Sequence, residues 1–224
     1  MKKAILPILS LILAGSACKK SSSTPDPVLE KYMSITAAST WNYRLVNNVT
    51  AVTTNYTLSS TTRDSTINGR AYHVFSNSNT GAGEYYFISG NDYYTFRKLG
   101  IATSSTTMED NYMKDNSPVG TSWPQTVNLS ITGVPFPIPI TVTYTITEKG
   151  SSRIVNGVTY TDVIHVSGNI TSSLIPAANL TTDIQNYFAR RYGMIETNNK
   201  LALNFMGVSQ NVDNKTVLIS ADIK

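Results

Sequence analysis

Cysteine and histidine are nearly missing from this chain. Its 224 residues include one cysteine and two histidines, so no internal disulfide can form and no cysteine- or histidine-rich zinc site is available. A Gly-x-Ser-x-Gly motif is also absent. Nucleophilic catalysis needs a base beside the nucleophile, and His73 and His165 are interpreted as ordinary solvated histidines of a sheet. The sequence therefore predicts no enzyme, no metal and no cofactor.

The acidic residues show no spacing that favours a catalytic pair or a calcium loop. The candidates for acid–base chemistry are scattered along the chain: Glu84, Asp92, Glu148 and Asp162. Asp162 interrupts the apolar face of its strand, and we expect a local irregularity that turns it outward. Glu109, Asp110 and Asp115 lack the ordered oxygen ligands and the glycine of a calcium loop.

Charge is also scarce, because charged residues make up only 14% of the chain. The formal net charge of +4 includes Lys2 and Lys3, and it falls to +2 when residues 1–17 are removed. Such a small positive excess gives no reason to expect a nucleic-acid partner.

Residues 1–17 have the pattern of an export signal. Lys2 and Lys3 precede a short apolar stretch that is too short for a bilayer, which takes roughly 20 apolar residues. Small residues then lead to Cys18, the sole cysteine of the chain. This pattern resembles a bacterial lipobox, although Gly15 stands where leucine is usual. We expect lipidation of Cys18 and attachment to a membrane through that lipid. The alternative is an ordinary secretory signal cleaved after Ala17.

Residues 18–30 are predicted to form a disordered tether, because the stretch from Lys19 to Pro27 has no apolar residue to bury. The remaining residues, 31–224, predict a single β domain. Residues 28–38 are ambiguous between a short helix and a turn.

A hairpin pattern occurs twice in the domain. Residues 56–72 align without a gap with residues 144–160, and five positions are identical. Both windows contain Asn-Gly, at Asn68 and at Asn156, between β-forming residues. A type I′ turn needs positive φ at both central residues, so Asn-Gly is a strong hairpin signal. We therefore expect two related meanders, at about 39–98 and 118–224.

No segment has a sustained helical period, and short strands recur between turn signals. Within 140–147, apolar residues alternate with threonines, which is typical of a half-buried antiparallel strand. Strands are expected at 49–60 and 126–132, whereas 100–116 is expected to be a loop with one helical turn or strand. The predicted fold class is all-β, a curved antiparallel sheet forming a half-barrel or open barrel with little helix.

Five weak motifs occur in order over about residues 39–198. They are Trp41-x-Tyr43, Asn68-Gly69-x-x-Tyr72, Pro118-Val119-Gly120-x-x-Trp123, Asn156-Gly157-x-x-Tyr160-x-x-Val163 and Tyr187-Phe188-Ala189-x-x-x-Gly193-x-Ile195. The set resembles a group of uncharacterised lipoproteins from Bacteroidota. Members often have Gly-Val-Gly where this chain has Arg191-Tyr192-Gly193. The resemblance implies a curved sheet similar to periplasmic lipoprotein-carrier half-barrels, a cell-envelope location and no established activity.

Members of this group sorted to the cell surface often carry acidic residues just after the lipidated cysteine. Here Lys19 and Lys20 follow Cys18. We therefore expect an outer-membrane lipoprotein on the periplasmic face rather than at the cell surface.

Aromatic residues are the remaining candidates for binding. Trp41, Tyr43, Tyr144 and Tyr160 are predicted to line a concave face that binds a hydrophobic or lipid ligand, although core packing alone also explains aromatic residues in a sheet. The alternative is a surface adhesion or glycan-binding module with an exposed row of tyrosines. A deep pocket would favour the first, and a flat tyrosine row the second.

The stretch 133–140 alternates proline with apolar residues. Prolines remove backbone donors and favour extended geometry, so this stretch is expected to be a hairpin tip or an edge. Phe136 and Ile138 are predicted to form an exposed finger that contacts a membrane or an envelope protein. The alternative is a tip folded back over the core.

Overall fold

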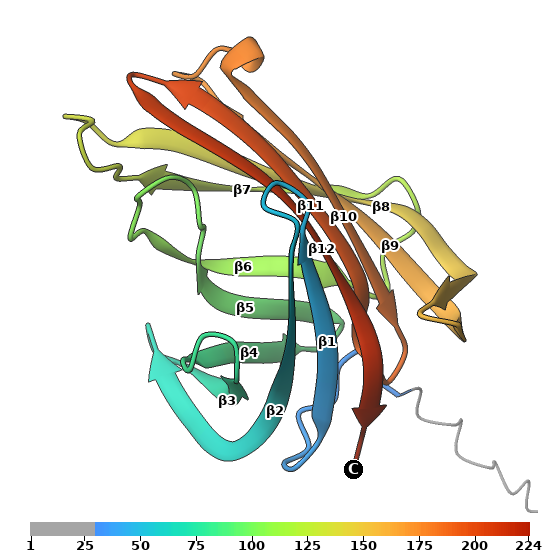
Figure 1. Cartoon of the computed structure of the whole chain (residues 1–224). Coiled ribbons are helices and arrows are strands. Elements are labelled where there is room, and N and C mark those ends of the chain that lie inside the picture. Colours follow the sequence, from blue (N-terminus) through green and yellow to red (C-terminus); the bar gives the residue numbers. More distant parts are fainter. Residues whose placement is uncertain (1–29) are drawn as a thin grey trace, which may run out of the picture.

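The computed structural model describes residues 30–224, and nearly all of them belong to one twelve-stranded antiparallel sheet (Figure 1). The strand order is β6-β5-β4-β3-β2-β1-β12-β11-β10-β9-β8-β7. Among the described residues the only helical element is η1, the 3-10 turn Ala177–Asn179. In this part of the chain no helix is long and apolar enough to span a membrane. The predicted all-β fold class is confirmed.

The sheet consists of two six-stranded meanders joined side by side. The first contains β1 (Thr40–Asn47), β2 (Val52–Ile67), β3 (Arg70–Asn77), β4 (Gly83–Ser89), β5 (Asp92–Lys98) and β6 (Thr107–Lys114). The second contains β7 (Ser122–Leu129), β8 (Ile138–Val155), β9 (Val158–Ser172), β10 (Leu180–Ala189), β11 (Gly193–Phe205) and β12 (Val208–Asp222). Strand β1 pairs with β12 along its whole length. Strands β6 and β7 are the two ends of the strand order, and they come together as the sheet curls into a nearly closed barrel (Figure 1).

The segment 100–116, expected to be mostly loop, contains the strand β6. The sequence did not show the alternating apolar pattern of a strand here. Asp110 is buried at an inward position of β6, where an apolar residue would normally reveal a strand. The first meander therefore extends to Lys114 rather than ending near residue 98.

Both predicted Asn-Gly turns are confirmed. Asn68 and Gly69 have φ values of 51° and 78°, and Asn156 and Gly157 have 49° and 80°. Each pair forms a two-residue connection, because the flanking residues pair directly with each other. The same turn conformation recurs between β11 and β12, where it was not predicted because Met206, at φ 51°, is an unusual residue for positive φ.

Strands β2 and β8 are much longer than expected. The sequence predicted that they end near Ser60 and Thr147, but both continue to the Asn-Gly turns through irregular register. Strand β2 shifts register between Ser60 and Asp64, and it bends strongly in Figure 1. An extra residue in a strand interrupts the two-residue alternation and bends the chain, which explains why these stretches did not look like strands.

Residues 30–33, here called the N-terminal strap, attach to both meanders. The Tyr32 amide donates to the Tyr93 hydroxyl of β5 at 3.0 Å, and the Arg191 amide donates to the Lys31 carbonyl at 2.7 Å. Met33 forms an isolated bridge with Tyr192. The strap is thus extended rather than helical. Residues 1–29, with the predicted signal, Cys18 and most of the tether, lie outside the described residues.

Candidate functional site

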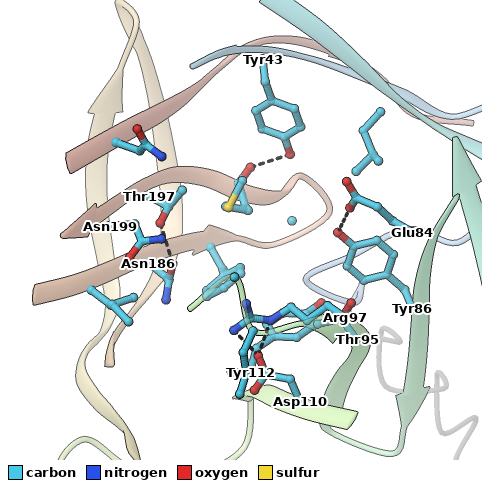
Figure 2. Close-up of a pocket in the computed structure, with 18 of the residues that line it drawn as sticks. Tyr43, Glu84, Tyr86, Thr95, Arg97, Asp110, Tyr112, Asn186, Thr197 and Asn199 are labelled. Atoms are coloured by element: carbon cyan, nitrogen blue, oxygen red, sulfur yellow. Dashed lines mark hydrogen bonds and ion pairs between the residues drawn. The ribbon is translucent and has the colours of Figure 1, made fainter. Parts of the chain in front are cut away.

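The barrel encloses a cavity of about 500 Å³. Its wall is formed by inward side chains of both meanders together with Met33 of the strap. Figure 2 shows that the polar side chains enter the cavity from separate sides. The labelled ones are Tyr43, Glu84, Tyr86, Thr95, Arg97, Asp110, Tyr112, Asn186, Thr197 and Asn199. This volume lies within the range of roughly 300–1,000 Å³ that is typical of small-molecule sites.

Three of the four predicted ligand-binding residues line this cavity. Trp41, Tyr43 and Tyr144 do so, and each is almost fully buried. Tyr160 does not line it and packs edge-on against Tyr192, with ring centroids 5.1 Å apart. The prediction for Tyr160 is wrong because the residue lies in the third pair from the Asn-Gly turn, on the far side of an irregular stretch of β9.

Two of these rings are fixed by hydrogen bonds to the start of β11 and to the residue just before it. The Trp41 indole donates to the Tyr192 carbonyl at 2.8 Å, and the Tyr43 hydroxyl donates to the Met194 carbonyl at 2.9 Å. Polar tips that are held in this way leave the rings as rigid apolar surfaces toward the cavity.

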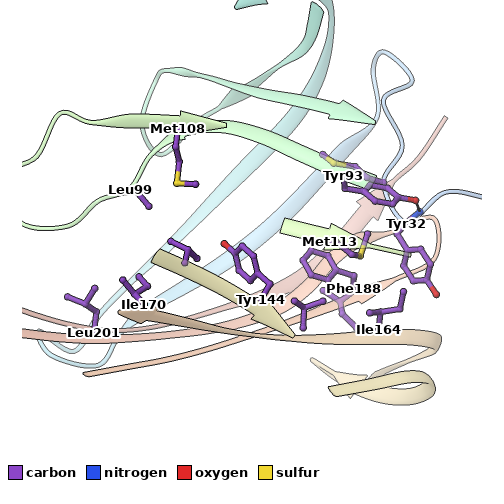
Figure 3. Close-up of a cluster of buried hydrophobic side chains, with 14 of the residues drawn as sticks. Tyr32, Tyr93, Leu99, Met108, Met113, Tyr144, Ile164, Ile170, Phe188 and Leu201 are labelled. Atoms are coloured by element: carbon purple, nitrogen blue, oxygen red, sulfur yellow. Dashed lines mark hydrogen bonds between the residues drawn. The ribbon is translucent and has the colours of Figure 1, made fainter. Parts of the chain in front are cut away.

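Buried apolar side chains lie on either side of Tyr144 (Figure 3), and several of them line the cavity. One group contains Tyr32, Tyr93, Met113, Ile164 and Phe188, and the other contains Leu99, Met108, Ile170 and Leu201. The second group includes the start of the loop between β5 and β6. Gln210 of β12 secures this loop, because its amide accepts from the Ala102 amide at 2.5 Å and donates to the Gly100 carbonyl at 3.0 Å.

One polar group of the cavity is an ion pair supported by a tyrosine. Arg97 contacts Asp110 at 2.7 Å, and the Tyr144 hydroxyl donates to the same carboxylate at 3.0 Å. Asp110 is 1% exposed, whereas 41% of the Arg97 side chain is accessible. Arg97 is also one of the residues that line the cavity. Burial raises the pKa of the Tyr144 hydroxyl above its usual range, and the charge of Asp110 raises it further.

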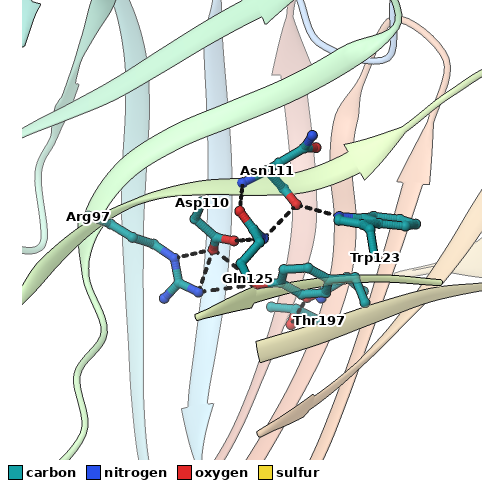
Figure 4. A network of polar contacts seen from close by, with 8 residues as sticks. Arg97, Asp110, Asn111, Trp123, Gln125 and Thr197 are labelled. Atoms are coloured by element: carbon teal, nitrogen blue, oxygen red, sulfur yellow. Dashed lines mark hydrogen bonds and ion pairs between the residues drawn. The ribbon is translucent and has the colours of Figure 1, made fainter. Parts of the chain in front are cut away.

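The same carboxylate connects the cavity wall to the contact between β6 and β7, here called the seam (Figure 4). The Gln125 amide of β7 accepts from the Asn111 backbone amide at 2.8 Å and donates to the Asn111 carbonyl at 3.1 Å. It also donates to Asp110 at 3.1 Å. The Trp123 indole donates to the Asn111 carbonyl at 2.7 Å. At the seam, side chains of β7 therefore form the hydrogen bonds to the β6 backbone that a neighbouring strand's backbone forms elsewhere in the sheet.

A second polar group surrounds Glu84 on β4. Its carboxylate accepts from the Tyr86 hydroxyl at 2.6 Å and from the Asn77 side-chain amide at 2.5 Å. A third group is uncharged, and it lies on β10, β11 and β12: Asn186, Thr197, Asn199 and Asn214. Within it, Thr197 donates to Asn186 at 2.7 Å. The cavity thus combines aromatic and aliphatic walls with a few separated polar groups, which suits an amphipathic ligand.

The fold recurs in a solved structure of low sequence identity. A protein of Bacteroides fragilis, described as an exported protein with a YmcC-like fold, matches with a TM-score of 0.50 and 10% identity over 86% of this chain and 99% of that chain. A protein of Parabacteroides distasonis, described as a lipoprotein, matches with a TM-score of 0.49 and 11% identity over 87% of this chain and 99% of that one. No protein-family model matches the chain, and no curated protein matches it.

His73 is more organised than the sequence suggested. Its Nε2 lies 2.8 Å from the Ser60 hydroxyl and its Nδ1 lies 3.0 Å from Asp64, in the order of contacts of a hydrolase triad. A nucleophile must reach its substrate, yet Ser60 is only 4% exposed, does not line the cavity, and has its hydroxyl 3.1 Å from the Ile35 carbonyl. These contacts instead stabilise the bend of β2.

His165 is not the solvated histidine that was expected, because its side chain is only 12% exposed. It stacks on Tyr187 with centroids 4.1 Å apart, and the Arg153 guanidinium lies 3.3 Å from the centre of the same ring. Asp162 behaves as predicted. Its φ of 53° marks the irregularity that turns it outward, where it pairs with Arg190 at 2.5 Å.

The predicted contact loop is exposed at only one of its two residues. Phe136 is 41% exposed, whereas Ile138 is fully buried. Ile138 is the first residue of β8 and shares the inward face with Ile140, so the prediction that it is exposed is wrong. A contact role for Phe136 stays a prediction.

Proposed function

We propose that this protein is a lipid-anchored, non-enzymatic protein of the cell envelope that binds a hydrophobic or lipid ligand inside its barrel. The observation that carries the proposal is the cavity of about 500 Å³, whose wall contains Trp41, Tyr43 and Tyr144 together with aliphatic side chains. Binding of an apolar ligand in a preformed cavity is favourable, because it removes the apolar surfaces of the ligand and of the cavity wall from water.

The envelope location rests on the N-terminal sequence. A short apolar stretch and small residues precede Cys18, and the structural neighbour from Bacteroides fragilis is described as exported. Lipid on Cys18 would hold the protein at the outer membrane, with Lys19 and Lys20 favouring the periplasmic face. Replacing Cys18 with serine should move the protein from the membrane fraction to the soluble fraction. A wild-type protein that is soluble and unmodified would contradict the anchor.

A glycan is the second candidate ligand, because Asn186, Thr197, Asn199 and Asn214 supply uncharged hydrogen-bonding groups on one wall of the cavity. An outer aromatic surface is a weaker site for stacking sugars. There, Arg70 lies 4.7 Å and 4.9 Å from the ring centres of Phe87 and Tyr94 and covers them. A glycan is therefore expected inside the barrel rather than outside it.

The test is to fill the cavity without removing a hydrogen bond. Thr95 lines the cavity and its side chain makes no hydrogen bond within the described residues, so Thr95→Phe should occupy the space of a ligand. Thr159→Phe, on the exposed part of β9, is the matched control. Native mass spectrometry of each protein after incubation with envelope lipid extract should show bound lipid for wild type and the control but not for Thr95→Phe. Equal lipid binding by all three proteins would contradict the site, and binding of oligosaccharide alone would favour the glycan.

A further inference from the structure

Glu84 is a carboxylate in the cavity wall without a cation. Its hydrogen-bond donors are the neutral groups of Tyr86 and Asn77, and none of the ion pairs formed within residues 30–224 includes it. Asp110 in the same wall is neutralised by Arg97 at 2.7 Å. Glu84 is partly buried and lines the cavity, so its carboxylate is available to a cationic group of a ligand.

Glu109, a carboxylate on the outside of the barrel, has the cationic partner that Glu84 lacks within the described residues. Glu109 of β6 also accepts from a tyrosine hydroxyl, that of Tyr72, but it is paired with Arg70 at 2.6 Å. Glu109 does not line the cavity, whereas its neighbour Asp110 does, as expected where side chains alternate between the two faces of a strand. Within the described residues, the chain thus provides a cation for Glu109 on the outside and none for Glu84 in the cavity wall.

Tyrosine rings gather around Glu84 in the cavity. Tyr43 and Tyr56 stack with centroids 5.3 Å apart, and the centroids of Tyr86 and Tyr112 are 6.4 Å apart. Burial raises the pKa of the Tyr56 hydroxyl above its usual range, and the charge of Glu84 raises it further. The same two causes raise the pKa of Tyr86. The Tyr43 hydroxyl already donates to the Met194 carbonyl, so a ligand would contact the Tyr43 ring.

Resting on the function proposed above, we propose that the ligand is an amine-bearing amphiphile whose ammonium group binds Glu84 among Tyr43, Tyr56 and Tyr86. A carboxylate gives a charged hydrogen bond to an ammonium group, and tyrosine faces attract cations. The apolar part of the ligand then contacts the aliphatic wall, which includes Leu58, Val142, Ile184, Leu201 and Val212.

The experiment compares octylamine with octanol by isothermal titration calorimetry. The Cys18→Ser protein is used without detergent, because detergent would compete for the cavity. Octylamine should bind more tightly than octanol by on the order of tenfold to a hundredfold, the range expected of a hydrogen bond to a charged group. Ethylamine, which keeps the ammonium group and loses most of the apolar chain, should bind much more weakly than octylamine.

Two substitutions locate the effect. Glu84→Gln keeps one oxygen that accepts from Asn77, and its new amide group can donate to the Tyr86 hydroxyl. The barrel should therefore stay folded, and this variant should bind both octyl ligands equally. Glu109→Gln, the outer control, should keep the preference for octylamine. Equal binding of octylamine and octanol by wild type would overturn the inference and leave the proposed function standing, whereas failure of both to bind would overturn both. A preference lost equally in both variants, or ethylamine binding as tightly as octylamine, would also overturn it.

Discussion

The two meanders meet twice, and the two junctions are built differently. At one junction β1 and β12 form an antiparallel ladder in which every residue of β1 has a partner. At the other, the seam, β6 and β7 exchange no ladder and are held by the side chains of Gln125 and Trp123. Pro124, between these two residues, has no backbone donor to offer β6.

This difference indicates which junction can open. Separating β1 from β12 breaks a continuous ladder and exposes the buried residues behind it. Separating β6 from β7 breaks a few side-chain hydrogen bonds, while each meander keeps its own ladders. A typical hydrogen bond contributes about 0.5–1.5 kcal/mol net, and opening the seam breaks fewer of them than opening the ladder. We therefore expect a ligand to reach the cavity through the seam.

The largest effect is expected at the ladder. Leu218 of β12 pairs with Tyr43 and is fully buried. Leu218→Ala should lower the free energy of unfolding by about 2–5 kcal/mol, as other large-to-small core changes do. Urea denaturation measures the change. Val127→Ala on β7, where the side chain is only partly buried, should cost clearly less, and an equal cost would contradict the contrast between the junctions.

An intermediate effect is expected for Gln125→Ala at the seam. The change removes the hydrogen-bond acceptor of the Asn111 backbone amide and one donor to Asp110, so it should cost about 1–3 kcal/mol. It should also speed the release of a bound hydrophobic dye in stopped-flow fluorescence. Thr126→Ala is the control, because Thr126 contacts Thr141 within the second meander and not β6. If dye release were unchanged by Gln125→Ala, the seam would not be the route.

The smallest effect is expected at the end of the seam. The Ser130 amide donates to the Thr106 hydroxyl at 3.1 Å in an exposed position, where water can replace the lost partner. Thr106→Val should therefore lower the free energy of unfolding by only about 0.5 kcal/mol. Hydrogen exchange should speed up at the Ser130 amide and stay unchanged at the Asn111 amide. Faster exchange at both amides would show that the seam opens as one unit.

Much of the fold could be predicted because its signals are local. Asn-Gly at positions 68–69 and 156–157 sets two turns through the conformations of its own residues, and the alternation in 140–147 identifies its inward face. Trp41, Tyr43 and Tyr144 could be predicted for the cavity wall because large aromatic residues at alternating positions of a strand face inward together.

The remaining features depend on partners far away in the sequence. Asp110 is acceptable inside a barrel only because Arg97 and Tyr144 surround it, so its strand showed no apolar period. Gln125 at the seam looks like any polar residue of a half-buried strand until β6 lies beside it. Glu84 was considered as one of several acids, but its neutral partners and the absence of a cation within the described residues emerge only from the fold.

The N-terminal strap would have a mechanical consequence if the proposed lipid on Cys18 holds the protein to a membrane. A pull arriving from the membrane side would reach the bond between Arg190 and the Glu30 carbonyl first, at 2.7 Å. It would then be divided between the Arg191 amide of the second meander and the Tyr93 hydroxyl of the first. Because the load would be shared in this way, a pull on the anchor would act on both meanders together and would not draw one away from the other across the cavity.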